Sequence, residues 1–60
     1  MFEQRIRSIE CEVTIYTLFG VARGDVVECF DGWFTFKVKH NNSVVSLYYE
    51  DVLMLEEHQL

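Results

Sequence analysis

Residues 30–39, FDGWFTFKVK, predict a tight turn followed by the clearest β-strand in the chain. Asp31 and Gly32 both tolerate positive φ, which the tight turns of β-hairpins require. After the turn, apolar and polar side chains alternate with a period of two, as they do in a half-buried strand. One face is expected to carry Phe34, Phe36 and Val38, and the other Trp33, Thr35, Lys37 and Lys39. This stretch therefore indicates an all-β protein.

Towards the N-terminus, the same period of two predicts two further strands and then ends. One strand is expected over residues 21–30, with Gly24 marking a bend or a bulge. A turn at Phe19-Gly20 separates it from a strand over residues 9–16, where Ile9, Cys11, Val13 and Ile15 are the inward positions. Residues 1–8 lack the alternation and are expected to form a helical turn or two.

Towards the C-terminus, Asn41-Asn42 predicts another turn, because asparagine readily adopts left-handed backbone conformations. A strand over residues 43–49, a break at Glu50-Asp51 and a last short strand over residues 52–55 are expected to follow. Residues 56–60 are expected to be a frayed tail. The prediction is a single domain over residues 1–60: a small, strongly bent, five-stranded all-β barrel with a short N-terminal helical turn.

Composition bears on the partners. The chain has 60 residues, of which 50% are hydrophobic, and a formal net charge of −5. Domains of this size bury only about 60% of the surface that the unfolded chain exposes, so we expect the surplus apolar residues to lie in a homo-oligomer interface. The net charge disfavours nucleic acid unless the basic residues cluster. The absence of a long apolar run or a leader-like segment predicts a cytoplasmic protein with no membrane role.

Catalysis and metal binding find little support in the sequence. The thiols and imidazoles (Cys11, Cys29, His40 and His58) lack the spacing of zinc ligands, so no metal or other cofactor is expected. Cys11 is expected to be a buried free thiol, and His58 to lie in the tail. The sequence contains no glycine-rich phosphate loop and no nucleophile with a plausible histidine base. An enzyme is therefore not expected.

Several residues resemble the Sm-like (LSm/Hfq-like) family at matching spacing: Val13, Ile15, Tyr16, Gly20, Glu28, Phe30, Asp31 and Trp33. The resemblance covers about residues 11–55 and implies a small barrel that forms a ring through the edges of its fourth and fifth strands. The resemblance implies that such a ring contains five to seven copies of the chain. The chain departs from Hfq where that family carries the lysine and histidine of its RNA-binding pore, since Tyr49 and Glu50 occupy those positions. Sm-like and SH3-like barrels share one strand pattern, so both remain open.

Candidate nucleic-acid-binding residues are one aromatic and four cationic side chains: Trp33, Lys37, Lys39, Arg5 and Arg7. An aromatic ring beside cations suits base stacking and phosphate neutralisation. The alternatives are a solvated strand face for the first three and an ion pair of Arg7 with Glu3 one helical turn away. Tyr48, Tyr49 and Glu50 are the candidate pore or interface residues.

Two functions remain open at this point. The first is a divergent Sm-like ring that binds RNA through these residues. The alternative is an acidic small-barrel adaptor or inhibitor, of phage or mobile-element origin, that binds another protein. The family resemblance favours the first, and Glu50 at the expected basic position favours the second.

Overall fold

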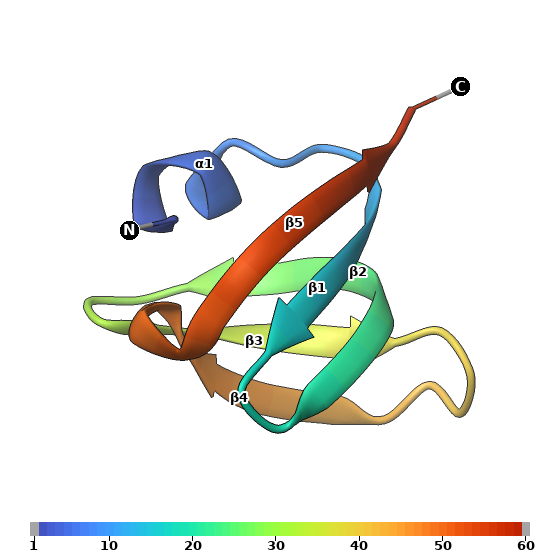
Figure 1. Cartoon of the computed structure of the whole chain (residues 1–60). Coiled ribbons are helices and arrows are strands. Elements are labelled where there is room, and N and C mark those ends of the chain that lie inside the picture. The colour runs from blue at the N-terminus through green and yellow to red at the C-terminus, as the bar shows by residue number, and fades with distance from the viewer. Residues whose placement is uncertain (1, 60) are drawn as a thin grey trace.

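The computed structural model describes residues 2–59 and contains one five-stranded antiparallel sheet preceded by a short helix (Figure 1). The elements are α1 (Glu3–Arg7), β1 (Glu12–Thr17), β2 (Gly20–Cys29), β3 (Trp33–Val38), β4 (Val44–Tyr48), the 3-10 helix η1 (Tyr49–Asp51) and β5 (Val52–His58). The strand order is β4-β3-β2-β1-β5. This confirms the predicted five-stranded β fold with an N-terminal helical turn. Within residues 2–59, hydrogen bonds do not close the sheet, so β4 and β5 are its two edges.

The long strand β2 bends the sheet into two layers. Its first half pairs with β1 and its second half with β3, and Gly24 pairs with both neighbours. Figure 1 shows β2 curving from the layer of β1 and β5 to that of β3 and β4. The sequence predicts a bend or a bulge at Gly24. The register shift lies instead between Val26 and Glu28, so the bulge is contradicted, whereas Gly24 lies where β2 passes from pairing with β1 to pairing with β3. Gly24 instead permits a close approach, because a Cβ there would overlap the backbone carbonyl of Lys37.

The core lies between the two layers and under the helix. Ile6 of α1 is fully buried, and Phe2 and Ile9 are partly buried against the same core. The remaining buried apolar residues are Val13, Ile15, Phe34, Phe36, Tyr49, Val52 and Leu55. Phe34 and Phe36 are the inward positions of β3, so the alternation predicted for this strand is confirmed. No helix within residues 2–59 is long and apolar enough to cross a membrane.

Both turns next to β3 have the predicted backbone. Gly32 has φ of 86° and Asn42 has φ of 60°. The Phe30 amide donates to the Trp33 carbonyl at 2.8 Å and closes the β2–β3 hairpin. These two turns fix which β3 residues face β2 and β4, and therefore which side chains form rows across the outer face.

The start of β1 and the end of β5 differ from prediction. β1 begins at Glu12, and Cys11 is half-buried in the bend before it rather than fully buried within the strand. β5 continues to His58, so residues 56–58 are not a frayed tail; Leu60 lies outside the described residues. These polar residues are held because they pair with Glu12, Val13 and Thr14 of β1. The Thr14 hydroxyl also lies 2.7 Å from Nε2 of His58.

Candidate binding surface

The cationic side chains are already engaged with carboxylates of the same chain. Arg5 pairs with Glu57 at 3.3 Å, Arg7 pairs with Glu3 at 3.0 Å, and Arg23 and Lys39 both pair with Glu12. Lys37 alone forms no ion pair within residues 2–59. The five predicted nucleic-acid-binding residues therefore do not form one basic surface, since Lys39 turns to Glu12 and each arginine has its own carboxylate.

The Glu12 cluster lies in an open hollow of about 850 Å³. Arg23 first, and then Lys39, lower the pKa of the Glu12 carboxyl because they hydrogen-bond to its charged form. The hollow also contains Cys11 and His58. Within residues 2–59, no group of three His, Cys, Asp or Glu side chains is placed to hold a metal ion. Its charged groups mainly neutralise one another.

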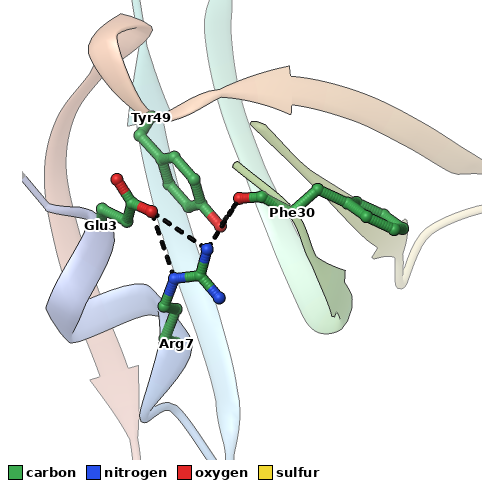
Figure 2. A network of polar contacts seen from close by, with 4 residues as sticks. All are labelled: Glu3, Arg7, Phe30 and Tyr49. Atoms are coloured by element: carbon green, nitrogen blue, oxygen red, sulfur yellow. Dashed lines mark hydrogen bonds and ion pairs between the residues drawn. The ribbon is translucent and has the colours of Figure 1, made fainter. Parts of the chain in front are cut away.

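A second polar network ties the helix to the β2–β3 hairpin (Figure 2). The Arg7 guanidinium donates to the Phe30 carbonyl at 2.9 Å and to the Glu3 carboxylate. The Tyr49 hydroxyl donates to the same Phe30 carbonyl at 3.0 Å. The predicted pairing of Arg7 with Glu3 is therefore confirmed, and Arg7 also fixes the position of Phe30.

Tyr49 is a core residue, which corrects its assignment to the pore or interface. Its side chain is 2% exposed and stacks on Phe34 with 5.2 Å between ring centroids. Burial, and then a hydrogen bond with Cys29, raises the pKa of the Tyr49 phenol to about 12. The residue turns inward because η1 begins at Tyr49, where the strand alternation stops. Tyr48 and Glu50 on either side are exposed.

Phe30, Trp33 and Tyr48 form a row of aromatic rings on the outer face, hereafter the aromatic row. Phe30 and Trp33 stack with 4.3 Å between centroids and 18° between planes. Trp33 pairs with Tyr48 across β3 and β4, so their side chains share a face. Phe30 and Trp33 are each 36% exposed and Tyr48 is 59% exposed. The row therefore presents aromatic surface from the turn after β2, from β3 and from β4 to solvent.

Carboxylates, and not cations, lie next to the aromatic row. Asp31 is in the hairpin that joins Phe30 to Trp33, and Glu28 pairs with Thr35 in the next row on the same face. Glu50 follows Tyr48 by two residues. All three are exposed, and none forms an ion pair within residues 2–59. Lys37 lies two rows from Trp33, opposite Asp25.

A small hollow of about 260 Å³ opens beside the aromatic row at the edge strand β4. Trp33, Ser46, Leu47 and Tyr48 line it. Two aromatic rings form its walls and the Ser46 hydroxyl supplies a hydrogen-bonding group. This lining suits the aliphatic stem of a side chain that ends in a polar or charged group.

The two sheet edges expose further apolar side chains. β4 exposes Val44, Val45 and Tyr48 and has no charged residue, and β5 exposes Leu53 and Met54. The hairpin between β1 and β2 exposes Leu18 and Phe19, the latter 82%. Leu55 of β5 lies in the core, whereas Leu18, Phe19, Tyr48 and Leu53 are exposed.

The sequence pattern missed Phe30, Glu28 and Asp31 as parts of one surface with Trp33 and Tyr48. The usable signal was the Asp31-Gly32 turn, because a tight hairpin places Phe30 opposite Trp33. Comparison of this chain with family models, curated proteins and solved structures gives no match.

Proposed function

We propose that this protein is a non-enzymatic, self-assembling module that binds other proteins. Copies join the β4 edge of one protomer to the β5 edge of the next, and the assembly presents its acidic, aromatic outer face to a protein partner. The observation that carries the proposal is the chemistry of the two edges of the sheet within residues 2–59: β4 and the first half of β5 have no further strand beside them, expose apolar side chains and carry no charge.

Edge strands of soluble monomers are usually protected from pairing. Lysine, proline, inward charges or bulges make an edge unsuitable for another chain. β4, Val44–Tyr48, has none of these, and Val44 and Val45 are exposed on it. The first half of β5 exposes Leu53 and Met54 and is uncharged, and its pairing with β1 shifts register at Leu53. Pairing β4 with β5 joins their free backbone groups and buries these four side chains.

The resemblance to Sm-like domains supports the same arrangement, since that family forms rings through its fourth and fifth strands. It also implies five to seven copies. The resemblance does not extend to RNA binding with equal force, because Tyr49 is buried and Glu50 is acidic where the family has basic pore residues.

The distribution of charge favours the acidic adaptor or inhibitor over the RNA-binding ring. Nucleic-acid affinity comes largely from cations that neutralise phosphates. Within residues 2–59, every Lys and Arg except Lys37 has a carboxylate partner. Binding RNA would require these ion pairs to break, and the net charge of −5 would oppose the approach.

Edge variants test the assembly. Val44→Lys on β4 and Met54→Lys on β5 each place a charge at one edge, and Val27→Ser is the control, because Val27 is exposed on β2, the middle strand of the sheet. Sedimentation velocity is expected to show that either edge variant dissociates the assembly while the control keeps it. Equal masses for all four proteins would overturn the edge-to-edge arrangement.

A further inference from the structure

We propose, resting on the protein-binding function above, that the aromatic row and its acidic neighbours bind cationic side chains of a basic segment of the partner protein. The site comprises Phe30, Trp33 and Tyr48 with the carboxylates of Glu28 and Asp31. A guanidinium or ammonium group lies over the rings, and its aliphatic stem enters the hollow lined by Trp33, Ser46, Leu47 and Tyr48.

The rings suit a cation. The face of an aromatic ring attracts Arg and Lys through its quadrupole, most strongly for tryptophan, and Trp33 is the one tryptophan of the chain. Trp33 and Tyr48 share a face and remain substantially exposed. A planar guanidinium can stack on these rings, so the site is expected to prefer arginine to lysine.

The rings are also held in position before any partner arrives. Phe30 stacks on Trp33, and the Phe30 carbonyl accepts hydrogen bonds from both Arg7 and Tyr49. The Phe30 amide is bound to the Trp33 carbonyl. Such preorganisation reduces the entropy that binding must remove.

Charge complementarity identifies the occupant as basic. Glu28, Asp31 and Glu50 are exposed and form no ion pair within residues 2–59. The nearest unpaired cation, Lys37, lies two rows away and opposite Asp25. Carboxylates beside exposed rings attract cations over a distance and repel phosphates.

A second copy of this chain is a poor occupant of the aromatic row. Its arginines and Lys39 are engaged with Glu3, Glu12 and Glu57. Edge pairing between copies extends the sheet sideways and leaves its outer face open. The same face therefore remains available to a basic partner in the assembly.

The single tryptophan gives a direct readout of occupancy. A blocked peptide of three Arg-Gly repeats is titrated into the full-length protein at moderate salt, followed by Trp33 fluorescence and by calorimetry. Glu-Gly repeats and an oligouridylate are the comparison probes. The Arg-Gly peptide is expected to change the fluorescence and to bind, the Lys-Gly equivalent to bind more weakly, and the other two not to bind.

Matched variants separate the site from general charge. Trp33→Leu and Tyr48→Leu, measured by calorimetry, are expected to weaken peptide binding about fivefold or more, within the range of cation–π contacts. The pair Glu28→Gln with Asp31→Asn is expected to weaken it similarly. Glu10→Gln with Glu56→Gln makes the same change in net charge before β1 and on β5. This control pair is expected to change the affinity for the peptide less than about twofold.

Equal losses from the two charge-matched pairs, or no binding of the Arg-Gly peptide by the wild type, would overturn the proposal. Binding of the oligouridylate with loss in Trp33→Leu would replace it with an RNA-stacking surface. Light scattering on Trp33→Leu and on Glu28→Gln with Asp31→Asn, whose residues lie outside β4 and β5, is expected to show an unchanged assembly. Failure of peptide binding in an intact assembly is thereby distinguished from failure of the assembly itself.

Discussion

The Arg7 guanidinium donates a hydrogen bond of 2.9 Å to the Phe30 carbonyl, 23 residues further along the chain. This contact joins α1 to the β2–β3 hairpin (Figure 2). It also fixes the backbone of Phe30, whose ring stacks on Trp33. Arg7 is therefore a positioning residue for the aromatic row. Arg7, a candidate nucleic-acid contact in the sequence, instead forms contacts within the domain.

Replacing Arg7 tests this role. Arg7→Lys keeps the charge but cannot donate through a planar fork to Glu3 and Phe30 together. We expect a lower midpoint of thermal unfolding and weaker binding of the Arg-Gly peptide. Arg5→Lys is the control, because within residues 2–59 the Arg5 side chain forms an ion pair with Glu57 of β5 and no hydrogen bond with Phe30. Equal effects of the two variants on peptide affinity would contradict the positioning role of Arg7.

Deprotonation of Tyr49 is expected to lower the stability of the domain at alkaline pH. Its folded-state pKa of about 12 lies above the ordinary value of 10, so the folded state holds the proton more tightly than the unfolded state. The associated stability is complete below pH 10 and is lost as the pH rises towards 12. Urea unfolding at several alkaline pH values is expected to show this loss in the wild type.

Tyr49→Phe is the matched variant that tests this loss of stability at alkaline pH. It keeps the ring in the core and removes the hydroxyl that donates to Phe30. We expect a cost of about 1 kcal/mol near neutral pH, typical of one hydrogen bond, and a smaller loss of stability between pH 10 and 12. The same alkaline loss in both proteins would show that another group causes it.

Gly24 is expected to be the glycine least tolerant of substitution. A Cβ at position 24 would lie 2.9 Å from the Lys37 carbonyl carbon and 3.1 Å from the Lys39 nitrogen, as well as overlapping the Lys37 oxygen. Relief of this overlap requires β2 and β3 to separate. We expect Gly24→Ala to cost about 2 kcal/mol or more, which lowers the unfolding midpoint of a domain this size by about 10 °C.

Gly32→Ala is the control for Gly24→Ala. A Cβ on Gly32 meets no atom within 4 Å, so only its positive φ of 86° opposes the substitution. That backbone strain costs about 1 kcal/mol. A larger loss of stability in Gly32→Ala than in Gly24→Ala would contradict the close approach of β2 to β3.

The sequence could predict features that local pattern determines. The alternation of Phe34 and Phe36 and the turns at Gly32 and Asn42 depend on neighbouring residues, and all were found. The extension of β5 to His58 was not predictable in this way, because those polar residues become a strand only through pairing with β1.

The candidate site was only partly predictable, for the same reason. Trp33 and Tyr48 could be named from the sequence, but their joining with Phe30 depends on strand register. Lys39 forms an ion pair with Glu12, which is distant in the sequence. Because the sequence does not show this pair, it predicts one basic, aromatic face that includes Trp33 and Lys39. Tyr49 turned inward because η1 interrupts the alternation there.

RNA binding is expected to be absent at moderate salt. Anisotropy of a labelled oligouridylate should show no saturable binding, and Lys37→Ala with Lys39→Ala should not change the signal, because Lys39 is paired and Lys37 stands alone. Saturable binding that weakens with salt, and whose salt dependence flattens in the double variant, would restore the RNA-binding ring.

The mass of the wild-type protein in solution, measured by size-exclusion chromatography with light scattering over a range of concentrations, tests the central claim most directly. The proposed joining of β4 to β5 predicts a stable species of several 7.1 kDa chains, with five to seven copies implied by the Sm-like resemblance. A 7.1 kDa monomer at every concentration would contradict self-assembly through the open edges of the sheet.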